Sequence, residues 1–330
     1  MPTQSAPRIA GIVATRAPIA VVIRRGPSRW TEQLVWNLET DEVIRGGWLA
    51  GRVEYESCDV SPDGRFLVGT YACHTPHAPP HQPVGYCVAV SRPPYFHVLA
   101  GWTRREVWGG GWNGPRALRL WDCRSSPSPD VGSVPPDVSV EVTARARFDA
   151  CEIPDRHLRT RGWTEVQQLE SELVNPDHES WARQLIAQGP PSPELVNVDQ
   201  SERFLAATEE FLATVQRAIP RYRPVREGVW VKRFARGHHE RRVSVAEPSW
   251  QGHHEVWSLH STDGAAQRTF RPDPRGCQWL DVDHRGRVVF GEEGCLWAWE
   301  GFPDGAPRMV ADLREHRVTR IATPPWAKEW

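Results

Sequence analysis

The chain has 330 residues, enough for one or two domains with a large core, and its 40 Lys and Arg residues nearly balance 41 Asp and Glu residues. A formal net charge of −1 argues against a dedicated nucleic-acid or anionic-membrane binder, while leaving room for local charged patches. Seventeen tryptophans are far more than a typical chain of this length carries, so they either pack between sheets or line a binding surface.

The N-terminal part of the chain alternates between apolar and polar residues. Residues 1–16 are expected to form a loose lead-in, and the alternation predicts strands from Ile19 to Arg25 and from Glu32 to Leu38. The apolar run from Ile9 to Ile23 is interrupted by an arginine and a proline, so it fits a strand better than a signal peptide. No apolar run approaches the ~20 residues that a membrane helix needs. We therefore expect a cytoplasmic, bacterial protein.

Two segments far apart in the chain can be laid over each other. The first runs from Trp36 to Gly64 and the second from Trp257 to Gly286, with a Trp-to-Gly spacing of 28 and 29. In both segments alternating apolar residues flank a tight turn, whose glycine supplies a positive φ. A repeating unit of about forty residues indicates a propeller blade. The matched stretches are Cys58-Asp59-Val60 with Leu280-Asp281-Val282, and Arg65-Phe66-Leu67-Val68 with Arg287-Val288-Val289-Phe290.

Two short motifs extend this interpretation to a family. The turn Ser61-Pro62-Asp63-Gly64-Arg65 resembles the turn between inner strands of TolB-like and WD40-like β-propellers, and Leu120-Trp121-Asp122 is similar to their blade-closing Trp-Asp pair. The resemblance covers about two segments of the chain. It implies a mainly β, propeller-like antiparallel sheet array and no particular activity, because propellers host enzymes, scaffolds and ligand binders alike.

Further strands are predicted between residues 86 and 148, broken by one turn or bulge at Val107–Gly114 and one Ser- and Pro-rich surface loop at Ser125–Pro136. The strands predicted there are Tyr86–Val90, Phe96–Trp102, Ala117–Cys123 and Val138–Phe148. Strands are expected again from Gly228 onward, and the tail Pro324–Trp330 is expected to close the sheet.

A helical insertion is predicted where the alternation stops. Thr164–Gln167 fits a capping box, and Val166, Leu169 and Leu173 follow at helical spacing. We expect the apolar residues of the insertion to be buried among themselves or against a sheet: Val166, Leu169, Leu173, Phe204, Phe211, Leu212 and Val215. The predicted organisation is propeller-like β repeats over residues 1–162, a helical insertion over 163–220 and further β repeats over 221–330.

Two segments offer metal ligands in incomplete patterns. Cys73, His74, His77, His81 and Cys87 could bind zinc through sulfur and imidazole, but their spacing fits no standard structural zinc pattern. Asp59–Gly64 begins like a calcium loop, but Thr70 stands where the acidic twelfth ligand is needed. We expect a solvated His-Pro loop and an ordinary turn, with no bound metal.

Gly109, Gly111 and Gly114 match a dinucleotide-binding pattern, yet a proline and a predicted strand follow them instead of a helix N-terminus. The pattern therefore predicts no phosphate site, and we expect no cofactor.

The seven cysteines are an odd number without a paired framework, which is typical of reduced, apolar core residues. Cys58 matches Leu280 in the second copy, an exchange that a core position tolerates and a ligand position does not. Cys87 and Cys295 match each other after the repeated turn. We expect these cysteines to be structural, without metal or disulfide.

Two sets of residues are candidates for binding. Trp102, Trp108 and Trp112, with Trp121 nearby, could form an aromatic platform for sugar or peptide, or could pack between adjacent blades. A basic segment could bind an anion or an acidic partner if its two histidine pairs meet across a hairpin, or could simply form the solvated face of that hairpin. Its residues are Arg236, His238, His239, Arg241, Arg242, His253 and His254.

No linear catalytic motif occurs in the sequence. We therefore expect a non-catalytic interaction or scaffold protein, whose partner is another protein or a peptide rather than nucleic acid or membrane. The alternative is an enzyme of hydrolase or lyase type, with a site assembled at the central mouth of the propeller from residues distant in sequence.

Overall fold

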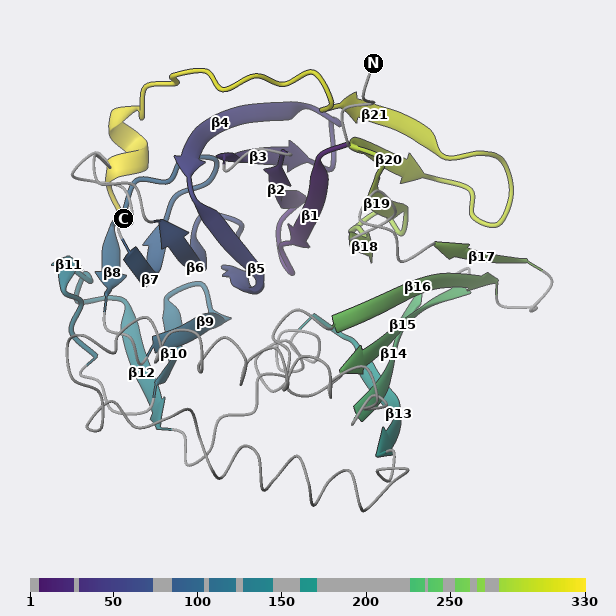
Figure 1. Cartoon of the computed structure of the whole chain (residues 1–330), viewed down its shortest axis with the longest axis horizontal. Coiled ribbons are helices and arrows are strands. Elements are labelled where there is room, and N and C mark those ends of the chain that lie inside the picture. Colours follow the sequence, from purple (N-terminus) through teal and green to yellow (C-terminus); the bar gives the residue numbers. More distant parts are fainter. Residues whose placement is uncertain are drawn as a thin grey trace, which may run out of the picture. The chain divides into compact units, whose positions relative to one another are not determined.

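The computed structural model describes residues 6–26, 30–73, 85–103, 107–122, 127–144, 161–170, 226–234, 237–245, 253–261, 266–270 and 279–330. Its described strands form five sheets, which Figure 1 colours along the chain. Contacts divide the chain into two compact units, one comprising Met1–Thr164, Lys232–Glu240 and Trp257–Trp330 and the other Glu165–Val231 and Arg241–Val256. No helix in these ranges is long and apolar enough to cross a membrane.

Three sheets come from the first half of the chain. Sheet 1 has the order β1-β2-β3-β4, with strands Arg8–Val13, Ile19–Arg25, Trp30–Asn37 and Val43–Ala50. Sheet 2 has the order β11-β8-β7-β6-β5, where β5 is Arg52–Val60, β6 Leu67–Cys73, β7 Gly85–Ser91, β8 Ala100–Trp102 and β11 Val131–Gly132. Sheet 3 has the order β12-β10-β9, with β9 at Val107–Gly114, β10 at Ala117–Asp122 and β12 at Ser139–Ala144.

Two further sheets follow. Sheet 4 has the order β13-β14-β15-β16-β17, with strands Thr164–Glu170, Arg226–Phe234, Gly237–Val245, His253–Ser261 and Gln267–Phe270. Sheet 5 has the order β18-β19-β20-β21, with strands Trp279–Val282, Val288–Glu292, Cys295–Trp299 and Arg308–Asp312. A short 3-10 helix spans Pro325–Lys328. The fold is therefore mainly β and built from several sheets, most of whose pairs are antiparallel; β10 with β12 is a parallel pair.

Sheets 5, 1, 2 and 3 pack on one another in that order, and each contact is an apolar core. In β2, Ala20 and Val22 join the core shared with sheet 5, while Val21 and Ile23 join the core shared with sheet 2. A third core joins sheets 2 and 3 around Phe66. The alternation was expected to mark half-buried strands, but both faces of β2 are buried because each neighbouring sheet covers one face.

The matched turns have the expected backbone. Gly64 and Gly286 have φ values of 75° and 73°. Each donates a backbone hydrogen bond to the carbonyl oxygen three residues earlier, at 2.8 Å for Gly64 and 2.9 Å for Gly286. The prediction of a positive-φ glycine in both copies is confirmed. Trp36 and Trp257 both lie on a strand that pairs with the last strand of its sheet, β4 or β17.

Three local predictions were wrong. The lead-in contains β1, which pairs with β2 from Arg8 to Val13. Its Gly11 packs against Trp279, whose ring a Cβ there would approach to 2.5 Å. The glycine-rich Val107–Gly114 is the strand β9, although its pairing with β10 is interrupted by two register shifts.

The third wrong prediction is the start of the helical insertion. Thr164–Glu170 is the edge strand β13 of sheet 4, so pairing with β14 outweighs the local helical spacing. No α-helix occurs within the ranges that the structure describes, and the rest of the expected insertion, residues 171–220, lies outside them.

The core cysteines lie where the repeat places them. Cys58 and its match Leu280 are 0% and 1% exposed, and Cys87 and Cys295 lie on the third strand of their hairpin sets, β7 and β20. Cys58, Cys73, Cys87 and Cys295 are free thiols. Burial raises the pKa of Cys58 and of Cys87 to about 12, so neither forms a reactive thiolate near neutral pH.

Candidate functional site

Residues 313–330, called the strap from here on, leave β21 and run past sheet 1 to sheets 2 and 3. Arg24 of β2 donates from Nε to the Leu313 carbonyl at 2.8 Å, and Arg45 of β4 donates to the Arg317 carbonyl at 3.3 Å. Farther along, Trp330 Nε1 donates to the Ser133 carbonyl at 2.7 Å. In Figure 1 the yellow strap passes β4 and ends beside β7 and β8. The strap therefore ties together sheets that are distant in sequence.

A buried carboxylate fixes the strap to sheet 1. Glu32 is fully buried, and its Oε1 accepts a hydrogen bond from Arg45 Nε at 2.8 Å. The other oxygen, Oε2, lies 2.8 Å from His316 Nδ1 on the strap. Both carboxylate oxygens have partners, which is the condition for burying this charge without a large loss of stability.

The far part of the strap lies on a cluster of arginines. The guanidinium groups of Arg65, Arg92 and Arg116 lie 5.4, 5.7 and 5.4 Å from the ring centre of the buried Phe66. They come from three places, namely the β5–β6 turn, the end of β7 and the β9–β10 turn. Three separate turns of sheets 2 and 3 thus present arginines to one aromatic ring, each at cation–π distance.

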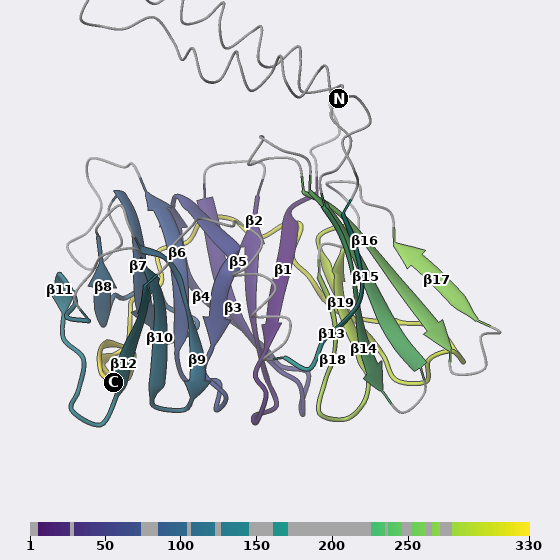
Figure 2. The ribbon, with the colours of Figure 1, turned by 90° about the horizontal axis from the view of Figure 1, so that it is seen from below.

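Aromatic side chains complete this arrangement, which we call the Phe66 cluster: Arg65, Phe66, Arg92, Trp112 and Arg116, with Trp326 and Trp330 of the strap. Trp112 stacks on Phe66 with 5.9 Å between ring centres, and Trp330 packs on the same ring at 5.3 Å. Trp330 also packs against the core of sheets 2 and 3, whose strands Figure 2 shows from another side.

The three arginines are poorly neutralised. Within the described ranges they form one ion pair, from Arg116 Nε to Asp137 at 3.5 Å, and Arg92 donates instead to the Trp326 carbonyl at 2.5 Å. Burial lowers the pKa of Arg92 below its ordinary value, and the positive charge of Arg65 is the second largest cause. The negative charge of Glu329 acts in the opposite direction but does not outweigh them. The cluster therefore concentrates like charge at the turn end of sheets 2 and 3.

Two N–H donors of this cluster are buried without an acceptor. Trp112 is 5% exposed, and its Nε1 makes no hydrogen bond in the described part of the chain. The same holds for Nη1 of Arg116. Both atoms can only donate, so only an acceptor atom could satisfy them.

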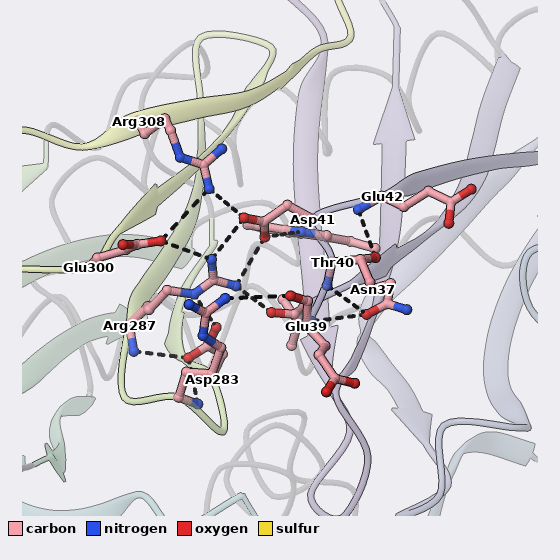
Figure 3. A network of polar contacts seen from close by, with 12 residues as sticks. Asn37, Glu39, Thr40, Asp41, Glu42, Asp283, Arg287, Glu300 and Arg308 are labelled. Atoms are coloured by element: carbon pink, nitrogen blue, oxygen red, sulfur yellow. Dashed lines mark hydrogen bonds and ion pairs between the residues drawn. The ribbon is translucent and has the colours of Figure 1, made fainter.

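The second copy of the repeat handles the matched arginine differently (Figure 3). Arg287 is 2% exposed; its Nε donates to Asp283 at 2.7 Å and its Nη1 to Asp41 at 2.9 Å. Although burial alone would lower the pKa of Arg287, hydrogen bonds to Asp41 and Asp283 raise it above its ordinary value. This network joins sheets 1 and 5 and leaves no donor for a ligand.

One difference between the copies lies within the turn itself. Asp283, which neutralises Arg287, is matched by Ser61, whose hydroxyl donates to Asp63 at 2.6 Å and accepts the Phe66 N–H at 2.9 Å. Ser61 has no charge to offer Arg65, and the Arg65 side chain is exposed above the Phe66 ring. The Arg65 charge is therefore available to a partner.

The residues singled out from the sequence lie elsewhere or deeper. Trp102 and Trp112 are buried between sheets 2 and 3, as packing between sheets requires, and Trp121 is also buried. Trp108 belongs to β9. His238 and His239 lie on β15, next to β16 with His253 and His254, while Arg236 lies outside the described residues. The anion-binding patch at these residues stays a prediction.

The metal candidates are resolved only in part. Cys73 Sγ donates to the Ala50 carbonyl at 3.1 Å, while His74, His77 and His81 lie outside the described ranges. Asp59 of the calcium-like segment accepts a hydrogen bond from the backbone N–H of Trp112 at 2.8 Å and another from the Arg161 guanidinium at 3.0 Å. Within the part of the chain that is described, no three His, Cys, Asp or Glu residues group as metal ligands would.

Sequence reasoning missed the arginines of the Phe66 cluster. The alignment of the two copies contained one usable signal, because Ser61 replaces the aspartate that precedes the arginine of the second copy. Arg92, Arg116 and the strap gave no such signal, since only the folded sheets bring them to Phe66.

No protein-family model and no curated protein sequence matches the chain. Among solved structures, the β-propeller domain of the trilobed protease from Pyrococcus furiosus is similar with a TM-score of 0.28 and 11% sequence identity, covering 92% of this chain and 83% of that chain. A similarity this low assigns neither family nor function.

Proposed function

We propose that the protein is a non-catalytic interaction protein of β-propeller type that binds an acidic peptide segment of a partner protein at the Phe66 cluster. The observation that carries this proposal is the gathering of Arg65, Arg92 and Arg116 around one aromatic ring with a single, long ion pair among the described residues. Like charges held together in this way favour an incoming anion.

The propeller arrangement is part of the proposal. Its support is the succession of sheets 5, 1, 2 and 3, which pack face to face through shared cores, and the recurrence of the same glycine turn in sheets 2 and 5. Loops and turns that a rigid sheet scaffold holds in place are common binding surfaces. The turn end of sheets 2 and 3 fits that role.

The strap indicates what kind of segment this surface accepts. Its own residues Trp326, Glu329 and Trp330 already lie against the arginines, as a peptide with one carboxylate between two indoles. Trp326 is 47% exposed, contacts Tyr95 with 5.6 Å between ring centres, and lies 5.3 Å from the Arg92 guanidinium. Trp, Tyr and Arg are the residue types that dominate binding energy at protein interfaces.

The composition of the cluster favours binding over catalysis. Arginines and aromatic rings bind and orient anions, but none of them is a general base or an activated nucleophile near neutral pH. The cluster therefore supports recognition of an acidic group without chemistry on it.

Affinity purification from the native host, read by quantitative mass spectrometry, tests the proposal. The tagged wild type is compared with Arg65→Gln plus Trp326→Ala, and with the control Arg119→Gln, which removes an arginine of β10 that pairs with Glu141 at 2.8 Å. A partner that is retained by the wild type and the control and is depleted at least about tenfold in the double variant supports the proposal. Equal recovery in all three samples contradicts it.

A further inference from the structure

The turn end of sheets 2 and 3 holds an excess of donors over acceptors. Trp112 Nε1 and Arg116 Nη1 are buried without a partner, and Arg65 adds a guanidinium that forms no ion pair with any described carboxylate. A buried donor without an acceptor lowers the stability of the fold. Such a cost is repaid when a ligand supplies acceptor oxygens to several of these donors together.

The nearest carboxylates do not fill this role. Asp63 Oδ1 already accepts from the Ser61 hydroxyl at 2.6 Å and from the Arg65 backbone N–H at 3.2 Å. Asp137 reaches Arg116 at 3.5 Å while its own side chain is 65% exposed. Glu329 contacts Arg92 through its backbone carbonyl, at 3.4 Å. The guanidinium groups thus keep donors that the fold does not use.

We propose that the Phe66 cluster contains an oxyanion subsite for one phosphate group, bound by Arg65, Arg92 and Arg116. A phosphate monoester offers three terminal oxygens and close to two negative charges at pH 7, whereas a carboxylate offers two oxygens and one charge. Three arginines from three different turns suit the group with more oxygens. This inference rests on the proposed function, because the phosphate is the acidic group of the segment bound there.

The contrast with Arg287 makes the subsite specific to one copy of the repeat. At the matched turn of sheet 5 the carboxylates of Asp283 and Asp41 occupy the guanidinium, so an anion that replaced them would leave the buried Asp283 without its counter-charge. Phosphate binding is therefore confined to the copy in which serine stands at this position.

Isothermal titration calorimetry of the purified full chain with inorganic phosphate, at constant ionic strength, tests the subsite. Phosphate binds to the wild type, and Arg65→Gln weakens the binding by about tenfold or more, because it removes charged hydrogen bonds. Arg65 is exposed, so this variant keeps the fold, and a melting curve verifies that it does. Arg119→Gln, the matched control on β10, binds phosphate as the wild type does.

Two results overturn the inference: no heat of binding at millimolar phosphate, or equal affinity in the wild type and Arg65→Gln. The source of the phosphate is found by repeating the titration with the peptide Trp-Ala-Lys-phosphoserine-Trp, which copies the end of the strap. Tighter binding than that of inorganic phosphate supports a phosphorylated partner segment, and weaker binding supports free phosphate as the ligand of the same subsite.

These titrations need no partner, so they separate the two proposals. If phosphate binds in the titration but no partner is depleted by the double variant, the proposed function is refuted and the phosphate subsite is supported. If a partner is depleted but phosphate does not bind, the proposed function is supported and the phosphate subsite is refuted.

Discussion

Arg65 and Arg287 follow matched turns in two different sheets, yet only Arg287 binds the carboxylate of its own turn, Asp283, at 2.7 Å. Arg287 is buried and links sheets 1 and 5, because its second partner is Asp41 of sheet 1. Arg65, with Ser61 in place of the aspartate, lies exposed on the ring of Phe66. Arg287 is held by Asp283 of its own turn and by Asp41 of sheet 1, whereas Arg65 forms no ion pair with a described carboxylate.

Replacing Arg287 by alanine should destabilise the protein strongly. The variant leaves Asp41 and Asp283 without their buried counter-charge, and breaking one side of such a pair typically costs about 3–5 kcal/mol. Urea unfolding followed by circular dichroism measures the loss. Arg65→Ala is the matched control and should change the unfolding free energy by less than about 0.5 kcal/mol. Equal effects of the two substitutions would refute the distinction drawn between these arginines.

Acid should weaken the same joint. Burial opposes ionisation of Asp41, but hydrogen bonds from Arg287 and Arg308 outweigh it and lower the pKa of this carboxyl to about 2. A carboxyl with a lowered pKa stabilises the fold fully above its unfolded value of about 4 and loses that contribution as the pH falls toward 2.

The Asp41→Asn variant isolates this effect. Asp41 has a φ of 63°, a conformation that asparagine also tolerates, so the exchange removes the charge with little backbone strain. Its unfolding free energy should lie below that of the wild type at pH 6, and the gap should narrow between pH 4 and pH 2. A constant gap over that range would show that Asp41 does not carry the acid dependence.

The two turn glycines provide a matched pair of substitutions. Alanine at either position meets the same positive φ, which costs about 1–2 kcal/mol. A Cβ on Gly64 would also lie 3.0 Å from Ile19 Cβ, whereas one on Gly286 would have no atom within 4 Å. Gly64→Ala should therefore lower the melting temperature more than Gly286→Ala in differential scanning calorimetry. The opposite order would show that contact with Ile19 is relieved at no cost.

The buried thiols should be inert and the fold indifferent to reductant. Because burial raises the pKa of Cys58 and of Cys87 to about 12, neither should be alkylated by iodoacetamide in the native protein at pH 8. Peptide mass spectrometry identifies the labelled sites, with the urea-unfolded protein as the control. Melting temperatures with and without a reductant should agree; a clear drop on reduction would reveal a disulfide and contradict a purely structural role.

The alternation of apolar and polar residues predicted those strands whose side chains show it clearly. The strand Ile19–Arg25 was predicted with the bounds that β2 has, because its apolar residues alternate between two cores. β9 was missed because its glycines carry no side chains that could show an alternating pattern. β1 was anticipated only in part, because the run from Ile9 was interpreted as a strand while residues 1–16 were expected to form a loose lead-in. β13 was mistaken for a helix start, since strand pairing is a tertiary effect.

The candidate site was less accessible to sequence reasoning than the fold. Phe66 and Arg65 were aligned with the second copy, but the meaning of Ser61 required the observed bond between Asp283 and Arg287. Arg92 and Arg116 reach Phe66 from other turns, and Trp330 reaches it from 264 positions away, counted from 66 to 330. Contacts over such separations leave no local periodicity to detect.

The strap also determines the order in which the chain can mature on the ribosome. Arg24 and the Leu313 carbonyl that it binds are separated by 289 positions. At synthesis rates of about 5–20 residues per second, Arg24 and Glu32 emerge roughly 15–60 s before the segment that covers them. During that interval Arg24 and Glu32 lack their strap partners, so these two contacts form only after the strap has been synthesised.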